Sequence, residues 1–479
     1  MVLYFVLGLV SLVFIVLLVV IATMTAIHRS VGYEFPTPKQ LEKDLDLNPL
    51  FRYLPDLKET LPWVSIGNFP TPIHRAEIKI PDKKQLRFYV KREDLSSPLY
   101  GGNKVRTLQH QLAIIQSRME KEEAVKEVVV LGSSGSNQVV ATVVHGCYRM
   151  GMPTFAGWID GEAPDLDNSL NMLSAMSFKN VNYATFGNKL ATFKRVFRAL
   201  VYGDGVVIAP GGNNPSGVIG QMTGPLEVAE QIMIGDMPDP DSIYVAMGSS
   251  CTVSGLIMGL ALVKYLNLNA FRSKDFKIHG LPIHHGFVGL QKKIGLFRRG
   301  FTRVVPLTIL QSLHTSCKYL REKLDGPDLL QISLFIFKHM TIIHDDVDLV
   351  AQYGAHSERS RAAANLFDKN GKLMDMDGKE KESMWLCGHF SAKSYAIMID
   401  DMLKDENEGK NFLFWETKSA VQPLGPENEW EKLLKEPEVV QKWASNGKAE
   451  SSLRPGKVNT EGGSKEDYRS LMTPIVNME

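Results

Sequence analysis

The strongest hydrophobic pattern of this chain lies at its N-terminus. Residues 1–28 contain no Asp, Glu, Lys or Arg, and Val, Leu, Ile and Phe dominate them. A helix of some 25 residues, rising about 1.5 Å per residue, exceeds the roughly 30 Å hydrocarbon core of a bilayer. The pattern therefore predicts one transmembrane helix over residues 1–28. The alternative is a cleaved signal peptide, since the small residues from Ala22 to Ala26 resemble a cleavage site.

The charges that flank this segment predict its orientation. No Lys or Arg precedes it, whereas Arg29, Lys39 and Lys43 follow it. Positively charged residues tend to stay on the cytoplasmic side of a membrane span. We therefore expect a single-pass membrane protein whose large C-terminal part lies in the cytosol.

After a Pro-containing linker or arm over residues 29–60, two hydrophobic patterns alternate along the chain. Short apolar runs, typical of buried strands, are separated by longer segments of helical period. This order predicts βαβ units, and hence parallel sheets covered by helices on both faces, with ligands at the carboxyl ends of the strands. The apolar runs are Arg87–Val90, Glu127–Leu131, Val206–Ala209 and Ser242–Met247, and the helical segments include Val105–Met119 and Val139–Met150.

The alternation extends to about residue 430, and a different kind of sequence follows. Residues 431–479 are interpreted as a C-terminal extension. Within it, residues 445–470 carry too few large apolar side chains to bury much surface, so we expect this part to be disordered.

Composition narrows the function classes. With 479 residues, 44% of them hydrophobic, the chain is long enough for two packed domains. Lys and Arg together number 54 against 53 Asp and Glu, so no large positive field exists to hold nucleic acid. The four cysteines lie far apart without a Cys-x-x-Cys pair, which favours a reducing compartment.

Three polar loops next to apolar segments contain the candidate catalytic and ligand-binding residues. The first is residues 91–108, where Gly101 and Gly102 allow a tight turn before a helix predicted to begin near Lys104. Burial and the positive end of a helix both favour a neutral amine, the form that reacts with a carbonyl. Taken alone, a lysine after two glycines is more often a solvated surface group.

The second loop, residues 131–140, follows a predicted strand and opens a helix. Ser133, Ser134, Ser136, Asn137 and Gln138 gather hydroxyl and amide groups there. Such donors at a helix start suit a substrate carboxylate or another anionic oxygen. The alternative is a serine N-cap in a polar turn, which explains one of these side chains but not all of them.

The third loop joins a buried strand to a helix of small residues. It consists of Gly248, Ser249, Ser250, Cys251 and Thr252. Backbone N–H groups and hydroxyls at the positive end of a helix bind phosphate well. The loop lacks both the Gly-Lys-Ser/Thr of a nucleotide-binding P-loop and a GxGxxG motif, which disfavours a nucleotide.

Five segments together resemble the fold-type II (tryptophan synthase beta-like) pyridoxal-phosphate enzymes, and within them the D-cysteine desulfhydrase / 1-aminocyclopropane-1-carboxylate deaminase family. They are FPTPIHRA (69–76), VKREDLSSPLYGGNKVRTL (90–108), GSSGSNQ (132–138), APGGNNPSGVIG (209–220) and GSSCT (248–252). The resemblance covers residues 61–422.

The resemblance implies an α/β fold in which two parallel-sheet αβα domains hold the cofactor between them. The smaller domain, about residues 105–225, is inserted in the larger one, within a catalytic region of residues 61–430. It also implies a homodimer, pyridoxal 5'-phosphate as cofactor, and elimination or deamination of a small amino acid.

Residue by residue, the resemblance implies specific roles. Lys104 matches the lysine that forms the Schiff base with the cofactor and moves protons at the substrate. Asn137 matches the residue that contacts the cofactor ring oxygen and the substrate. Ser136 and Gln138 match positions at the substrate carboxylate, Ser136 also being a possible catalytic hydroxyl. The third loop, Gly248 to Thr252, matches the phosphate-binding loop.

Departures from the family pattern lie near the C-terminus. The family commonly reads Asp-Pro-x-Tyr-x-Gly-Lys where residues 373–386 read LMDMDGKEKESMWL, which puts Gly378 at the tyrosine position. Tyr353 matches a second tyrosine and is predicted to remain an active-site group. Thr417 matches the partner of the pyridine nitrogen, but the two glycines that usually follow are absent.

These departures leave two alternatives to the main interpretation. In the first alternative, the chain is a membrane-tethered protein that keeps the fold but has lost or altered its catalysis. In the second, it is a β-replacement enzyme of the cysteine-synthase type, a class that shares the lysine and the phosphate loop.

Two further features of the sequence, a basic segment and a pair of histidines, are not assigned a catalytic role. Basic residues alternate with apolar ones over residues 289–303, which suits either an amphipathic segment lying on a membrane or an ordinary solvated helix. His284 and His285 have no Cys or acidic partner at ligand spacing, so no metal site is predicted there.

Overall fold

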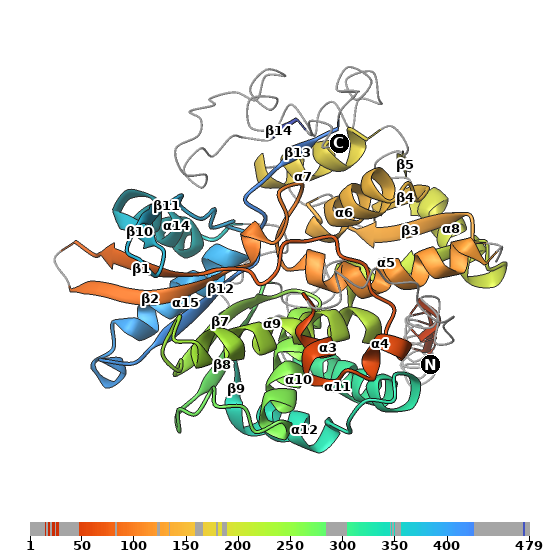
Figure 1. The fold of residues 1–479 in the computed structure, drawn as a ribbon. Helices are drawn as coiled ribbons and strands as arrows, with labels where there is room; N and C mark the ends of the chain where they lie inside the picture. The colour runs from red at the N-terminus through yellow and green to blue at the C-terminus, as the bar shows by residue number, and fades with distance from the viewer. Residues whose placement is uncertain are drawn as a thin grey trace, which may run out of the picture.

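The computed structural model builds the chain around two β-sheets. It describes residues 15, 18–19, 22–23, 25–27, 47–81, 84–121, 125–133, 135–158, 166–178, 181–183, 189–283, 304–344, 346, 349, 356–425 and 473–474. In Figure 1 the smaller sheet lies at the upper right, and the larger sheet runs from the left edge to the lower centre.

The smaller sheet has four parallel strands in the order β5-β4-β3-β6. Its strands are β3 (Glu127–Gly132), β4 (Thr154–Trp158), β5 (Val181–Tyr183) and β6 (Gly205–Ile208). Its helices are α5 (Lys104–Glu120), α6 (Asn137–Thr142), which continues as a π-helical turn (Val143–Arg149), α7 (Leu166–Met176) and α8 (Lys189–Val201).

Strand β3 is packed on both faces. Val128 and Val130 pack into one core, whereas Val129 and Leu131 pack with Ala199 of α8 on the other face. The strand is therefore buried on both sides, which explains its continuous apolar sequence.

The larger sheet has eight strands in the order β11-β10-β1-β2-β12-β7-β8-β9. They are β1 (Ile73–Lys79), β2 (Gln85–Arg92), β7 (Ser242–Met247), β8 (Lys277–Pro282), β9 (Thr341–Ile343), β10 (Gly371–Met374), β11 (Glu380–Lys381) and β12 (Phe412–Glu416). The predicted strands and the predicted helix over residues 105–119 are all present.

The expectation that both sheets are parallel is wrong for part of the larger sheet. Strands β2, β12, β7, β8 and β9 run parallel, but β1 pairs antiparallel with β2 and β10, and β10 pairs antiparallel with β11. Only five residues, 80–84, separate β1 from β2. So short a connection closes a hairpin, because a parallel crossover needs a dozen or more residues.

Helices cover both faces of the larger sheet. On one side lie α9 (Pro215–Met233), α10 (Cys251–Tyr265), α11 (Val304–Lys323) and α12 (Leu330–Met340), and on the other lie α14 (Glu358–Asn370) and α15 (Ser391–Met402). The described part of the arm forms α3 (Pro49–Tyr53) and α4 (Leu57–Thr60), whose Leu50, Phe51 and Leu57 pack into the larger core. Three 3-10 turns (Glu93–Leu95, Pro210–Gly212, Asp405–Asn407) and a short pair, β13 (Pro423–Leu424) with β14 (Thr473–Pro474), complete the described elements.

A buried network of charges joins the two parts of the molecule beside α5. Arg106 lies two residues after Lys104, and its guanidinium contacts Glu93 and Glu227, each at 2.6 Å. Lys91 reaches the same Glu227 at 3.1 Å. Because every member is buried and paired, removing one would leave an uncompensated charge in the interior. The network thereby fixes the start of α5 against β2 and α9.

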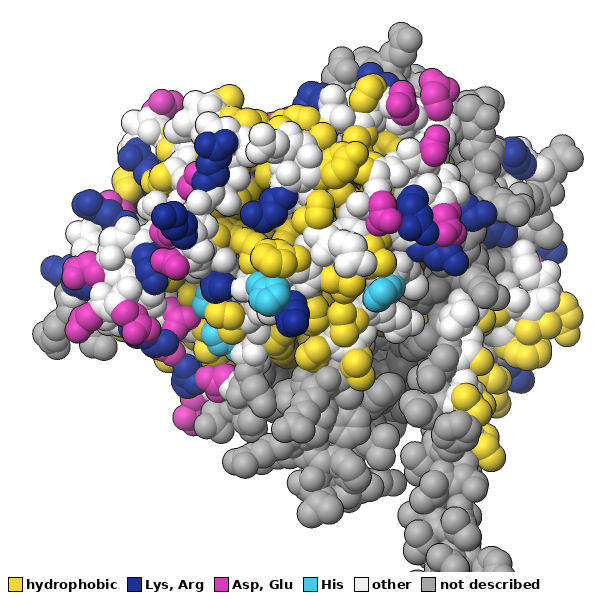
Figure 2. Space-filling model, turned by 90° about the horizontal axis from the view of Figure 1, so that it is seen from below, with side chains coloured by type: hydrophobic (Ala, Val, Ile, Leu, Met, Phe, Trp, Pro, Cys, Tyr) yellow, Lys and Arg dark blue, Asp and Glu magenta, His cyan; other side chains and the backbone are white. Residues whose placement is uncertain are grey.

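Seen from below, hydrophobic side chains occupy the middle of the surface, with charged side chains on either side (Figure 2). Exposed large apolar residues in this part of the fold are Leu307, Phe335 and Ile342, from α11, α12 and β9. A surface of this kind is typical of a contact region.

The predicted membrane helix falls mostly on residues that the structure does not describe. Across the residues that it does describe, no helix combines the length and the apolar character needed to cross a bilayer. The described parts of this segment include Ile15, Leu18 and Val19, each at least half exposed. The membrane helix therefore stays a prediction, as do the assignments of residues 289–303 and 445–470 and of His284 and His285, which lie outside the described residues.

Candidate active site

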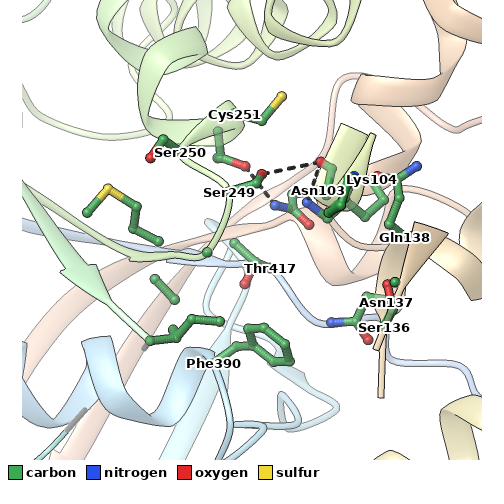
Figure 3. A pocket seen from close by; sticks show the side chains of 18 of the residues that line it. Asn103, Lys104, Ser136, Asn137, Gln138, Ser249, Ser250, Cys251, Phe390 and Thr417 are labelled. Atoms are coloured by element: carbon green, nitrogen blue, oxygen red, sulfur yellow. Dashed lines mark hydrogen bonds between the residues drawn. The ribbon is translucent and has the colours of Figure 1, made fainter. Parts of the chain in front are cut away.

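A cavity of about 270 Å³ lies where loops from the two sheets meet. Its walls come from the start of α5, the β3–α6 loop, the loop after β6, the β7–α10 loop and the end of β12 (Figure 3). The carboxyl ends of parallel strands are where ligands bind in such sheets. All three polar loops singled out from the sequence contribute to this one cavity.

Lys104 is the first residue of α5 and lines the cavity. Its Nζ donates a hydrogen bond to the Gly211 carbonyl oxygen at 3.2 Å. Burial lowers the pKa of the Lys104 amine, and the nearby Cys251 thiol offsets this in part. Among the described residues that line the cavity, Lys104 carries the only Lys, Arg, His, Asp or Glu side chain. The amine is thus desolvated and biased toward its neutral, nucleophilic form.

Gly211 keeps the floor of the cavity open beside Lys104. Its backbone has φ +69°, which an L side chain rarely adopts, and a Cβ here would lie 2.4 Å from Ser249 Oγ and 3.8 Å from Lys104 Nζ. No side chain fits this position without moving the β7–α10 loop. Only glycine therefore satisfies both the turn and the close approach.

Asn137 has a fixed orientation at the start of α6. Its Oδ1 accepts hydrogen bonds from Tyr100 Oη at 2.9 Å, Asn171 Nδ2 at 2.8 Å and Lys418 Nζ at 3.3 Å. Because three donors hold the oxygen, the amide nitrogen faces the opposite way. Asn137 therefore presents a donor to the cavity, which suits an anionic oxygen there.

Lys418 is a functional candidate that no sequence motif selects. It follows Thr417 directly, is buried, and its Nζ contacts Asn171 Oδ1 at 2.9 Å as well as Asn137. The same ammonium lies 4.5 Å from the Trp385 ring centroid. A cation in this place makes the end of the cavity near Asn137 electropositive. The partners of Lys418 lie up to 281 residues away in sequence, so no local motif predicts its position.

Ser136 and Gln138 flank Asn137 on the cavity wall. Ser136 is the N-cap of α6, where its Oγ accepts a hydrogen bond from the Val139 N–H at 3.3 Å. This capping bond uses the oxygen as an acceptor and leaves the hydroxyl proton for another partner. Gln138 is buried, and its Oε1 has no hydrogen-bond partner among the described residues. The Ser136 hydroxyl can therefore still donate a hydrogen bond to a ligand in the cavity, and Gln138 Oε1 can still accept one.

The third loop, Gly248 to Thr252, leads into the 15-residue helix α10, which begins at Cys251. The N-terminus of this helix faces the cavity. Ser250 has φ +70° at the N-cap and makes no side-chain cap, so the first N–H groups of α10 are not capped by it. Thr252 Oγ1 accepts from Asn103 Nδ2 at 2.7 Å, and Ser250 Oγ lies 2.7 Å from Thr308 Oγ1. Strained loops at a helix N-terminus are typical anion sites. Burial raises the pKa of the Cys251 thiol to about 11, so it remains protonated at neutral pH.

Thr417 lies on the opposite wall, directly after β12, together with Ile283 after β8 and Phe390 before α15. Figure 3 shows the Phe390 ring and Thr417 across the cavity from Ser249 and Ser250. The sequence analysis did not select Phe390.

The assignment of Gly378 to an active-site position is wrong. Gly378 has φ +83° in the turn between β10 and β11, where its N–H donates to the Asp375 carbonyl oxygen at 3.1 Å. Asp375 Oδ1 also accepts from the Lys379 N–H at 2.8 Å. Residues 373–381 therefore form a hairpin at the edge of the larger sheet.

Residues 387–393 read CGHFSAK, in which only Lys393 matches the Asp-Pro-x-Tyr-x-Gly-Lys pattern. Phe390, the fourth residue of this stretch, lines the cavity. Its aromatic ring carries no hydroxyl. Tyr353, the second tyrosine candidate, lies outside the described residues.

Comparison with known proteins adds independent findings. Residues 64–281 match the family model described as "Pyridoxal-phosphate dependent enzyme". This match contains all three polar loops of the cavity but not Phe390 or Thr417.

Two curated relatives are similar over part of their length. Nocardicin C-9' epimerase of Nocardia uniformis subsp. tsuyamanensis is 29% identical over 208 residues, which cover 42% of this chain and 60% of that protein. A mitochondrial bifunctional D-cysteine desulfhydrase/1-aminocyclopropane-1-carboxylate deaminase of Arabidopsis thaliana is 29% identical over 217 residues, which cover 41% of this chain and 50% of that protein. The matches thus span between half and three-fifths of the length of these relatives.

A solved structure described as an ACC deaminase homologue is similar in fold. It shares 19% sequence identity, covers 77% of this chain and 94% of its own, and has a TM-score of 0.49.

Proposed function

Residues 64–281 belong to the pyridoxal-phosphate dependent enzymes, and from this premise we propose that the chain is a lyase or deaminase that acts on a small amino acid through Lys104. The reaction resembles that of a D-cysteine desulfhydrase or a 1-aminocyclopropane-1-carboxylate deaminase. One observation carries the proposal: a desolvated lysine and a phosphate-type loop at a helix N-terminus line the same cavity.

The residues of the cavity fit pyridoxal 5'-phosphate. Gly248 to Thr252, at the positive end of α10, would hold its phosphate, and the space that a Cβ at Gly211 would fill lies between this loop and Lys104. The Asn137 amide nitrogen would donate to the ring oxygen. Thr417 would meet the pyridine nitrogen as a neutral hydroxyl. When bound, the cofactor supplies an electron sink for bond cleavage at the amino acid.

Lys104 would attach the cofactor through its amine and then accept and return the proton at the substrate carbon. Desolvation lowers the pKa of this amine and so favours its neutral form. Among the described residues of the cavity wall, no other Lys and no Arg, His, Asp or Glu competes for this role. Ser136 and Gln138 would bind the substrate carboxylate, with the Ser136 hydroxyl also placed to donate a proton.

Lys418 would act as a positioning residue through Asn137. Its ammonium holds the Asn137 oxygen at 3.3 Å and adds positive charge behind the amide. An anionic ring oxygen would be stabilised by this charge more than a protonated one. This role depends on the orientation of Asn137 and not on contact with the substrate.

Phe390 supports the alternative of altered catalysis. Phe390 carries no phenolic hydroxyl, and the described cavity lining contains no tyrosine, so a proton transfer at the substrate would fall to Lys104 or Ser136. A slow deaminase, a membrane-tethered binding protein and a cysteine-synthase-like β-replacement enzyme all remain compatible with the Lys104 site. They differ in product, because only elimination or deamination releases a 2-oxo acid.

The test is cofactor attachment followed by product analysis. The full chain, purified in detergent with pyridoxal phosphate, is reduced with borohydride, and the labelled peptide is identified by mass spectrometry. We expect one label on Lys104, none in Lys104→Ala, and an unchanged label in Lys393→Met, which alters another buried lysine outside the cavity lining. Label elsewhere or no label contradicts the proposal.

Substrate assays then separate the alternatives. D-Cysteine and 1-aminocyclopropane-1-carboxylate are added to the unreduced protein with pyridoxal phosphate bound, and the 2-oxo acid formed is measured. If O-acetylserine is consumed in the presence of a sulfur nucleophile and no 2-oxo acid forms, the reaction is a β-replacement. A labelled Lys104 with no turnover of any of these amino acids indicates a binding protein.

We propose further that residues 1–28 hold this domain on a membrane, with the globular part in the cytosol. The apolar composition of the segment supports this proposal. Membrane pelleting of the full chain at high salt, compared with residues 30–479, tests it. Equal amounts of both chains in the supernatant contradict a tether.

We also propose a homodimer, as the family resemblance implies. The exposed apolar side chains Leu307, Phe335 and Ile342 support the lower surface as the contact (Figure 2). Light scattering of residues 30–479 should give twice the chain mass, and Phe335→Glu should reduce it. A monomer mass for the unaltered protein contradicts the proposal.

A further inference from the structure

We propose that His279, His344 and Asp401 form a binding site for a divalent transition metal ion, with Zn²⁺ as the model ligand. The three residues come from β8, the residue after β9, and α15. His279 lies near the amino end of β8, four residues before Ile283 of the cavity wall. At about 3.3 Å per strand residue, the two sites lie roughly 13 Å apart along the same strand.

The three candidate ligand atoms form a triangle of suitable size. His279 Nδ1 lies 2.9 Å from His344 Nε2 and 3.7 Å from Asp401 Oδ2, and all three atoms lie within 4.8 Å of one another. A tetrahedral zinc site with bonds of about 2.0–2.1 Å separates its ligand atoms by roughly 3.3 Å. The two distances from His279 lie on either side of this value.

Neighbouring groups hold the ligands in place. Tyr244 Oη donates to Asp401 Oδ2 at 2.7 Å, and Lys404 Nζ donates to Asp401 Oδ1 at 2.6 Å. The Tyr244 ring stacks on His279 with centroids 4.3 Å apart, and the His279 and His344 rings stack at 5.1 Å. Such contacts fix the ring and carboxylate directions before an ion arrives.

Two basic side chains lie near the proposed ligands. Lys404 and Lys277 are the opposing charges near His279. They weaken the site, which makes Lys404 a useful probe.

The donor set selects the kind of ion. Two imidazole nitrogens and one carboxylate oxygen suit zinc and related first-row ions, whereas Mg²⁺ and Ca²⁺ prefer oxygen ligands alone. The side chains of His279 and Asp401 are 10% and 11% exposed, so water can reach the fourth position. A bound ion would join β8, the end of β9 and α15, whose first residue follows Phe390 of the cavity wall.

The experiment measures metal binding by the full chain with pyridoxal phosphate bound. After chelator treatment and dialysis, Zn²⁺ and Mg²⁺ are titrated by calorimetry, and Co²⁺ is added to record the visible absorption of a tetrahedral site. We expect one Zn²⁺ per chain, no Mg²⁺ binding, and at least a tenfold loss of Zn²⁺ affinity in His344→Ala and in Asp401→Asn.

Two control variants keep the result decisive. His339→Ala removes a nearby histidine outside the cluster and should leave the affinity unchanged. Lys404→Gln removes an opposing charge and should tighten binding. Absence of stoichiometric Zn²⁺ binding, or binding that His344→Ala and Asp401→Asn leave unchanged, overturns the proposal, and neither result bears on the Lys104 site.

Discussion

At the residue scale, single side chains decide what the cavity can do. Lys104 is the one strongly basic group among the described residues that line it, and Phe390 contributes an aromatic ring without a hydroxyl. Asn137 is oriented by three donors, one of them the buried Lys418. Two substitutions test these assignments separately.

The first concerns the missing hydroxyl. Phe390→Tyr should raise the turnover of D-cysteine or 1-aminocyclopropane-1-carboxylate by about tenfold or more, because a positioned acid or base commonly contributes 10²–10⁴-fold. The rate of 2-oxo acid formation measures this effect. Phe390→Leu, which lacks both ring and hydroxyl, is the control and should give no increase. An unchanged rate in Phe390→Tyr would show that this position does not govern proton transfer.

The second concerns Lys418. Lys418→Met should weaken pyridoxal phosphate binding by about tenfold, since it removes a positive charge and a donor that orients Asn137. The visible absorption of the bound cofactor should also change its pH dependence, which a purely structural loss would not cause. Lys410→Met, which alters a half-buried lysine that donates to Asn407 Oδ1, serves as the control. Identical spectra and affinities for the two variants would remove Lys418 from the site.

At the element scale, short loops between buried strands and helices build the site. The β7–α10 loop needs the space that Gly211 leaves, and α5 needs the buried Arg106 network to hold its first residue at the cavity. The larger sheet gains an antiparallel edge from two hairpins, β1–β2 and β10–β11. The apolar pattern of a strand is similar in both directions, so only connection length distinguishes them.

Gly211→Ala tests the loop contact. The added Cβ would lie 2.4 Å from Ser249 Oγ, so the loop must move and pyridoxal phosphate affinity should fall more than tenfold. Equilibrium dialysis of the cofactor measures this loss. Gly151→Ala is the matched control, because Gly151 has a similar φ of +70° but no atom within 4 Å of the added Cβ. Both variants should lose about 1 kcal/mol of folding free energy from backbone strain, and only Gly211→Ala should lose the cofactor.

At the scale of the whole molecule, buried histidines make stability depend on pH. His110 Nδ1 donates to the Pro62 carbonyl oxygen at 2.6 Å, and its Nε2 lies 3.0 Å from Tyr319 Oη. His145 Nε2 donates to the Tyr100 carbonyl oxygen at 2.9 Å. Burial lowers the pKa of His110 to about 3 and that of His145 to about 4. Both rings therefore stay neutral in the folded protein well below the ordinary histidine pKa of 6.5.

The sign of the effect follows from proton uptake. Below about pH 6.5 the unfolded chain binds protons that the folded chain excludes, so the free energy of unfolding falls as the pH falls from 6.5 toward 4. At pH 5 the loss should be about 2 kcal/mol for each of these two histidines. Urea unfolding at a series of pH values measures it. The double variant His110→Gln, His145→Gln should flatten the curve, and an equally steep curve would contradict the assignment.

The sequence by itself determined the local features of the protein. Apolar runs of strand length identified β2, β3, β6 and β7, because burial on both faces requires continuous hydrophobic residues. The GGNK, SNQ and GSSCT segments indicated the cofactor family, because tight turns and helix starts require particular residues at fixed local spacing. Lys104, Asn137 and Thr252 were thereby selected before their spatial relation was known.

Only the tertiary structure decided which distant residues share a site. It placed Gly378 in the turn between β10 and β11 and Phe390 on the wall of the cavity. It brought Lys418 to Asn137 and His279 to His344 and Asp401, pairs that no spacing rule connects. The physical reason is that local backbone preferences act over a few residues, whereas these contacts depend on how the sheets and helices pack as a whole.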